Sequence, residues 1–390
     1  MAKKSSRSLL ILFNTVFLYG MERSVIQTFD LLQPSITPYF MLSYTTRRCK
    51  LPLLTEIEER ELKHFFLSDH KDWPRFGKPT SLQHFWELFA TFIQGNIDML
   101  KISRKMDMLY VPSISYFFFG FLTVLSFRLS GKRVIYGFHD LILRRSWYLW
   151  FASLFITDFA HHNRWSLEAV ARENPYILRC NNFSGPFYAR SCASEIVTQS
   201  NSQLLAKKYV HLLFIGQVSW HKGVDLLIDA FCVLGEKYPD LVLHIVGGWS
   251  DAPFKQKLEE QLMTHHLLER VTFWGYQHEV QQYLHTADIY IHPSPPSRFQ
   301  ESFGRGVAEA MSAGLPTVCF CSGALPMLVI HEQTGMLCSD ETVQSLIENI
   351  EHLLTNQTLR NRCGQQALAH YQANYSGEVV RSKWLDFLAS

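Results

Sequence analysis

Two carboxylates, Glu301 and Glu309, lie eight positions apart in the last quarter of the chain. A turn containing Gly304 separates them and leads into a helix of small residues that ends at Gly-Leu-Pro. The first backbone N–H groups of a helix have no acceptor within the helix, so the amides of 303–306 can bind an anion. A phosphate held there, with a carboxylate on each side to accept hydrogen bonds from sugar hydroxyls, predicts a nucleotide-sugar pocket.

Three neighbouring segments strengthen this prediction. Each is a short apolar run, typical of a buried strand, followed by polar or small residues. The run over 211–215 leads through Gln217 to Lys222, the run over 241–246 ends at Gly247, and the run over 289–292 precedes Ser294. A fourth run, 271–274, leads to Tyr276.

Taken together, these segments resemble retaining glycosyltransferase family 4, whose members have the GT-B fold and an E-x(7)-E signature. The resemblance implies that Lys222 grips the donor diphosphate, while Gln217 stands where the family has arginine. It implies that Gly247 lies beneath the nucleotide, Tyr276 against the base and Ser294 at the pocket rim.

The same resemblance assigns roles around the acidic pair. Glu301 would contact the donor sugar and Glu309 the ribose. The amides of Ser302, Phe303 and Gly304 would hold the sugar, and those of Arg305 and Gly306 the phosphate. Arg298 or Arg305 could replace the cation that is missing at Gln217.

In the first half of the chain, the segment 14–24 resembles the family's diphosphate loop, with Gly20 left from the usual pair of glycines, and Glu22 and Arg23 match its E-R step. His139 follows the predicted strand 133–138 and resembles the family's catalytic, sugar-contacting histidine. A lone histidine at a strand end is also a common structural residue.

The composition predicts a globular protein, not a disordered one. The 390 residues are 47% hydrophobic and 18% charged, and the net charge is +2. The first half is basic and the second acidic, and the eight Cys include no C-x-x-C pair, which favours a reducing, cytoplasmic location. The basic and apolar residues at the start imitate a signal peptide, but a buried first strand over 9–13 fits them better.

Alternating apolar runs and amphipathic stretches favour β-α repeats and parallel sheets. We expect two Rossmann-like, doubly wound domains that face each other across a cleft: residues 1–195 on the acceptor side, 196–372 for the nucleotide sugar, and a helix over 373–390 returning to the first domain. Further strands are expected at 39–43, 108–111, 156–160, 176–179 and 317–320, and helical insertions over 51–105.

The expected reaction is transfer of a sugar, with retention, from a UDP- or GDP-linked donor to a glycan or lipid-linked acceptor. No D-x-D occurs in the sequence, so we expect no metal and no cofactor besides the nucleotide sugar. The alternatives are a catalytically weak or inactive nucleotide-sugar-binding protein, and a GT-B phosphorylase or epimerase. The basic residues form no dense run, which disfavours nucleic acid as a partner.

Two segments leave membrane contact open. Residues 111–129 are apolar and predict a core helix first, and a membrane-contacting one second. Around Trp147, Tyr148 and Trp150, arginines alternate with aromatic residues. That mixture suits peripheral contact with an anionic membrane on its inner face, and equally an aromatic core bordered by solvated charges.

Overall fold

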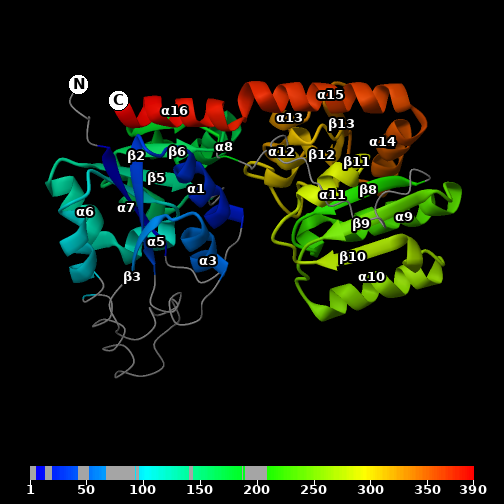
Figure 1. Cartoon of the computed structure of the whole chain (residues 1–390), viewed down its shortest axis with the longest axis horizontal. Helices are drawn as coiled ribbons and strands as arrows, with labels where there is room; N and C mark the ends of the chain where they lie inside the picture. Colours follow the sequence, from blue (N-terminus) through cyan, green and yellow to red (C-terminus); the bar gives the residue numbers. More distant parts are fainter. Residues whose placement is uncertain are drawn as a thin grey trace. The chain divides into compact units, whose positions relative to one another are not determined.

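The computed structural model describes residues 6–13, 20–42, 52–66, 93, 96–139, 144–186, 188 and 209–390. The chain divides into two compact units: the residues up to Tyr188 together with Val380–Ser390, and the residues from Ala189 to Val379. Each unit contains one parallel sheet covered by helices (Figure 1). The prediction of two Rossmann-like parallel-sheet domains is therefore confirmed, while the domain boundaries drawn from the sequence stay predictions.

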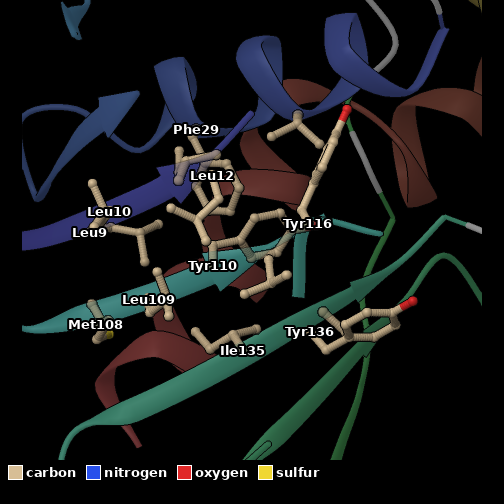
Figure 2. Close-up of a cluster of buried hydrophobic side chains, with 14 of the residues drawn as sticks. Leu9, Leu10, Leu12, Phe29, Met108, Leu109, Tyr110, Tyr116, Ile135 and Tyr136 are labelled. Atoms are coloured by element: carbon tan, nitrogen blue, oxygen red, sulfur yellow. The ribbon is translucent and has the colours of Figure 1, made fainter. Parts of the chain in front are cut away.

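The sheet of the first unit has the strand order β3-β2-β1-β4-β5-β6-β7. Buried apolar runs form its central strands, as expected where helices cover both faces. Leu10 of β1 lies beside Leu109 of β4 on one face of the sheet, and Phe29, from a helix, contacts Tyr110 of β4 on the other face with ring centroids 4.8 Å apart (Figure 2). The strands are β1 (Arg7–Leu12), β2 (Ile36–Leu42), β3 (Lys63–Phe66), β4 (Met108–Val111), β5 (Arg133–Phe138), β6 (Asp158–His161) and β7 (Asn181–Ser184).

Helices connect these strands in the right order for β-α repeats. They are α1 (Gly20–Leu31), α3 (Pro52–Glu59), α5 (Ile114–Phe119), α6 (Phe121–Leu129), α7 (Trp147–Ser153), α8 (Arg164–Glu173) and the 3₁₀ helix η1 (Pro175–Arg179). The apolar stretch 111–129 thus forms two helices that meet at Gly120. In the described parts of the chain, we find no helix with the length and hydropathy needed to cross a bilayer.

The final helix, α16 (Gly377–Ala389), provides part of the first unit's core. Trp384 is fully buried, and its ring lies 5.2 Å from Phe29 and 5.0 Å from Phe183, centroid to centroid. Its indole N–H donates a hydrogen bond of 3.1 Å to the carbonyl of Pro186. Residues 380–390 therefore complete a core whose other members precede the second unit in sequence.

Two predictions for the first half are wrong. Residues 176–179 form the 3₁₀ helix η1, which starts at Pro175, and the strand of this region is β7. Proline has no N–H for a sheet ladder, whereas β7 is a polar, mostly exposed edge strand without an apolar run. Edge strand β3 likewise lies inside the region 51–105, where only helical insertions were expected.

The sheet of the second unit has the order β10-β9-β8-β11-β12-β13, all parallel. The chain moves outward from β8 to β10 and then crosses to β11 on the other side of β8. In open α/β sheets such a switch point, at the carboxyl ends of the strands, is where ligands bind. The strands are β8 (Val210–Ile215), β9 (Leu241–Val246), β10 (Val271–Gly275), β11 (Ile289–His292), β12 (Thr317–Phe320) and β13 (Gly335–Cys338).

From α9 to α12, helices alternate with these strands, as expected for β-α repeats. The helices of the second unit are η3 (Trp220–Lys222), α9 (Val224–Lys237), α10 (Ala252–Thr264), η4 (Leu268–Arg270), α11 (Gln281–Thr286), α12 (Arg305–Ser312), α13 (Leu325–Leu328), α14 (Val343–Thr355) and α15 (Gln357–Asn374). Strand β13 and helices α13 and α14 were not predicted.

Candidate active site

The switch point of the second sheet brings three of the predicted residues into contact. Lys222 ends η3, which follows β8, and Ser294 follows β11. Glu301 lies in the loop before α12 and is buried. Its Oε1 accepts hydrogen bonds from Lys222 Nζ at 2.7 Å and from Ser294 Oγ at 2.8 Å. Lys222 and Glu301, which are 79 positions apart in the sequence, are thus in direct contact.

A third group on the same oxygen was not predicted. His292, the last residue of β11, is buried, and its Nε2 lies 2.8 Å from Glu301 Oε1. Its other ring nitrogen, Nδ1, is 3.4 Å from the hydroxyl of Tyr290, which itself donates to the carbonyl of Ile215 at 3.1 Å. The ring is therefore held on both sides. The only sequence signal was a histidine at the end of a buried strand, directly before Pro-Ser.

The charge of Glu301 follows from these contacts. Burial by itself raises the pKa of this carboxyl group, but the charge of Lys222 and the hydrogen bonds from His292 and Lys222 outweigh burial. They hold the pKa of Glu301 well below its ordinary value. Glu301 is consequently an anion at neutral pH, with a cation already beside it.

Backbone contacts fix the position of Glu301. Gly323 has a left-handed backbone (φ +55°), and a Cβ atom there would lie 2.1 Å from the carbonyl oxygen of Glu301. Only glycine allows the two segments to approach so closely. The next residue, Ala324, donates its N–H to that same carbonyl at 2.8 Å. The path of the main chain, more than side-chain packing, therefore sets where the carboxylate lies.

The turn into α12 has the predicted form. Gly304 is the N-cap, with φ +85°, and a Cβ atom there would lie 2.5 Å from a methyl group of Leu325. As a glycine, this N-cap residue has no side chain with which to cap the helix. Glu309 lies about one turn inside α12, is buried, and its Oε1 accepts a hydrogen bond of 2.8 Å from Arg305 Nε. Both members of the acidic pair are thus ion-paired within the second unit.

The remaining predicted donor-binding residues lie at or near the same edge of the sheet without joining this cluster. Gln217 follows β8 and is exposed, and its side chain is not among the three donors to Glu301. Gly247 follows β9, and the exposed Tyr276 follows β10. Ser302 and the buried Phe303 precede Gly304, and Gly306 is in the first turn of α12.

Both arginines that could compensate for Gln217 are already paired with carboxylates. Arg298 Nη1 lies 2.8 Å from Asp225 Oδ1 of α9 and donates to the carbonyl of Trp220 at 3.1 Å. Arg305 is paired with Glu309, as described above. In this state of the protein, Lys222 is the cation directly bound to Glu301.

In the first unit, the predicted site residue His139 is a neutral, buried histidine. His139 follows β5, as predicted, and its Nε2 lies 3.0 Å from the hydroxyl of Tyr110. Its ring centroid is 4.8 Å from that of His162, which follows β6. Desolvation, followed by the proximity of His162, lowers the pKa of His139 well below its ordinary value, so this ring is neutral at pH 7. Gly20 begins α1, and the loop 14–19 before it lies outside the described residues.

Tyr110 and His162 were not predicted from the sequence. Burial raises the pKa of Tyr110 well above 10, so its hydroxyl keeps its proton. Desolvation, with a smaller contribution from His161, lowers the pKa of His162 to about 3. Three groups in their neutral forms, Tyr110, His139 and His162, therefore lie at this edge of the first sheet.

Comparison with known proteins agrees with this geometry. Residues 196–370 match the family of glycosyl transferases group 1. The chain is 32% identical over 178 residues to an uncharacterized glycosyltransferase of Haemophilus influenzae, covering 45% of this chain and 48% of that one. It is also 32% identical over 164 residues to D-inositol 3-phosphate glycosyltransferase of Corynebacterium aurimucosum, covering 41% and 38%. The chain thus spans less than half the length of these curated relatives.

Solved structures match over nearly the whole chain. HepE of Anabaena, solved in complex with UDP and glucose, superimposes with a TM-score of 0.77 at 17% identity, covering 98% of this chain and 99% of that one. Identity at this level shows the fold alone. The chain therefore has the two-sheet GT-B fold, and its residues 196–370 are similar to glycosyl transferases group 1.

Proposed function

We propose that this protein transfers a sugar from a UDP- or GDP-linked donor to a hydroxyl group of a glycan or lipid-linked acceptor. The observation that carries the proposal is the convergence of Lys222, His292 and Ser294 on one oxygen of Glu301 at the switch point of the second sheet. The curated relatives are glycosyltransferases by name, and HepE was solved with UDP and glucose.

The ion pair between Lys222 and Glu301 suggests how a donor would bind. The diphosphate carries more charge than a single carboxylate and can attract Lys222 Nζ away from Glu301. The uncovered carboxylate would then accept hydrogen bonds from the sugar hydroxyls. The N-terminus of α12, which begins after the glycine N-cap Gly304, would add its amides and dipole to the phosphate site.

In the proposed reaction, the bond between the anomeric carbon and the diphosphate oxygen breaks while the acceptor oxygen bonds to the same face of the sugar. The configuration is retained, and the departing phosphate takes the proton of the acceptor hydroxyl. Lys222 and the α12 amides would stabilise the growing negative charge. We infer that they do so without a divalent metal, because the sequence contains no D-x-D.

His139 would act on the sugar as a neutral group. A ring whose pKa is lowered can donate or accept a hydrogen bond at pH 7 without attracting the anionic diphosphate. We infer that it contacts a hydroxyl near the anomeric carbon. The hydroxyl of Tyr110 would keep the ring in one orientation.

One observation favours a second candidate, a nucleotide-sugar-binding protein with little or no turnover. Gln217 replaces the family's arginine, and both nearby arginines are bound to carboxylates. A charged hydrogen-bond donor is roughly twice as strong as a neutral one, so the leaving group would be less well stabilised. Donor binding would then occur without transfer.

The test uses the purified full chain and a panel of UDP- and GDP-sugars. Thermal shift identifies the donor that binds, and release of UDP or GDP is then followed with and without glycan or lipid-linked acceptors. We expect Glu301→Gln to lower kcat about 100-fold or more, and the exposed Glu279→Gln to leave it unchanged.

Each other outcome has a distinct meaning. Near-normal turnover of Glu301→Gln would refute the assignment of this carboxylate. Binding without transfer or hydrolysis would support the non-catalytic candidate. A product that needs inorganic phosphate in place of the acceptor would indicate a phosphorylase, and isomerised donor without transfer would indicate an epimerase.

A further inference from the structure

Helix α7 carries an apolar stripe that faces solvent. Trp147, Trp150 and Leu154 follow one another at helical spacings of three and four and so share one face. Their exposed fractions are 63%, 49% and 54%. On the opposite face, Leu149 and Ala152 are fully buried in the core of the first unit. The aromatic residues of this stripe are therefore surface groups and do not form a core.

The stripe lies on a firmly packed support. Phe118 of α5 contacts the other side of α7, with its ring centroid 5.7 Å from that of Tyr148. On the η1 side, Tyr176 donates its hydroxyl to the carbonyl of Ser146 at 2.6 Å. This packing brings η1 alongside α7, and η1 adds Leu178, which is 56% exposed. The exposed side chains thus stand on elements that are fixed to each other.

Positive charge surrounds this stripe. Arg144 and Arg145, which directly precede α7, are both exposed, and so is Arg179 at the end of η1. We call the set Arg144, Arg145, Trp147, Trp150, Leu154 and Leu178 the α7 surface. Exposed apolar groups that form a patch usually mark an interaction site.

We propose that the α7 surface docks on an anionic lipid bilayer. Tryptophan is enriched at the boundary between headgroups and acyl chains, where its ring is partly buried and its N–H stays hydrated. Arginines beside it bind phosphate headgroups and are attracted by the negative surface potential. This combination fits a lipid surface better than an acidic protein, because the aromatic and aliphatic groups need an apolar phase to enter. The proposal goes beyond sugar transfer and does not depend on it.

The experiment is flotation of the full chain with vesicles of phosphatidylcholine, with or without phosphatidylglycerol. We expect binding to the anionic vesicles at low ionic strength and loss of binding at high salt. Arg144→Gln and Arg145→Gln should each weaken binding about fivefold, and Trp147→Ser with Trp150→Ser should weaken it further. Arg164→Gln, an exposed arginine paired with Glu168, and Trp220→Ser, an equally exposed tryptophan of the second unit, serve as matched controls that should bind normally.

Circular dichroism and thermal unfolding confirm that each variant is folded, as expected for exposed positions. Absence of binding to anionic vesicles at low salt would overturn the proposal, as would equal binding to neutral vesicles. A concentration-dependent dimer that Trp147→Ser abolishes, without vesicle binding, would assign the surface to a second copy of this chain and would also overturn it. Activity on a water-soluble acceptor is assayed separately, so failure here leaves the proposed transfer reaction intact.

Discussion

The carboxyl edges of the two sheets differ in the charge of their buried polar side chains. At the edge of the second sheet, a buried carboxylate is stabilised by a lysine and two further hydrogen-bond donors. At the edge of the first sheet, desolvation keeps two histidines and a tyrosine in their neutral forms. The first arrangement can exchange an internal anion for a diphosphate. The second suits uncharged hydroxyl groups, which need orientation more than charge.

The largest effect is expected from removing the cation of the second edge. Lys222→Ala leaves the buried Glu301 with only His292 and Ser294 and removes the group proposed to bind the diphosphate. Loss of one partner of a buried ion pair is strongly destabilising. We expect kcat to fall at least about 100-fold and the melting temperature to drop, measured by nucleotide release and by thermal unfolding.

Lys237→Ala is the matched control for this variant. Lys237 Nζ lies 2.6 Å from Glu351 Oε1, but this lysine is largely exposed. Exposed ion pairs contribute little, so both measurements should stay near those of the unaltered protein. Equal effects of the two substitutions would contradict the distinction between a buried functional pair and a surface pair.

A second prediction concerns neutral buried histidines, which are not confined to the first edge. His244 of β9 lies 2.9 Å from His211, nitrogen to nitrogen, and accepts a hydrogen bond from the indole of Trp274 at 3.2 Å. Desolvation first, and His211 second, lower the pKa of His244 from 6.5 to about 4. Above pH 6.5 neither the folded nor the unfolded state protonates this ring.

As the pH falls below 6.5, the unfolded chain takes up a proton at this position while the folded protein does not until about pH 4. The free energy of unfolding should therefore decrease across this window, by about 3 kcal/mol from His244. Urea unfolding of His244→Gln should show a shallower pH dependence than the unaltered protein. Identical slopes for the two proteins would disprove this account.

A smaller effect should follow from removing the hydroxyl group that orients His139 at the carboxyl edge of the first sheet. Tyr110→Phe removes the hydroxyl 3.0 Å from His139 Nε2 and leaves the ring otherwise in place. Partners that orient metal-binding histidines typically contribute 10- to 100-fold. By analogy, we expect about a tenfold loss in kcat, with KM little changed and a shifted pH profile of kcat.

Tyr39→Phe provides the comparison for Tyr110→Phe, because its hydroxyl binds only the exposed Lys63 among the described contacts. This variant should retain full activity. If Tyr110→Phe changes only the melting temperature and neither kcat nor its pH profile, the hydroxyl has a purely structural role.

The smallest effect is expected from adding a positive charge at Gln217, where the resemblance to the glycosyltransferase family implies an arginine. Gln217→Arg would place a second cation after β8, at an exposed position that can accommodate it. Because charged donors roughly double the strength of a hydrogen bond to phosphate, kcat should rise several-fold in steady-state assays. No change, with unaltered donor affinity, would show that Lys222 and α12 already satisfy the leaving group.

The sequence predicted the fold well where strands are buried and clearly terminated. The bounds of β9, β11 and β12 match the predicted ranges because each is an apolar run that stops at a glycine or another polar or small residue. It failed at β3 and β7, which lie at the two edges of the first sheet. An edge strand is stabilised by one neighbour and needs no continuous apolar face, so its sequence resembles a loop.

In the candidate site, too, some contacts could be predicted from the sequence and others could not. The pairing of Arg305 with Glu309 could be predicted from their i, i+4 spacing on a helix. The role of His292 could not, since it exists only because the loop before α12 brings Glu301 back to the end of β11. Nothing in the local sequence shows that the end of β11 faces the loop before α12. The same holds for Tyr110 and His162, which reach His139 from two different strands.

The position of Trp384 in α16 has a consequence for protein synthesis. A ribosome releases residues up to Tyr188 long before it makes this tryptophan, yet Phe29, Tyr110 and Phe183 pack around its ring. The first unit therefore cannot complete its hydrophobic core until the second unit and the final helix have been translated. Since Tyr110 also contacts His139, the neutral edge of the first sheet reaches its final geometry only when the last helix docks.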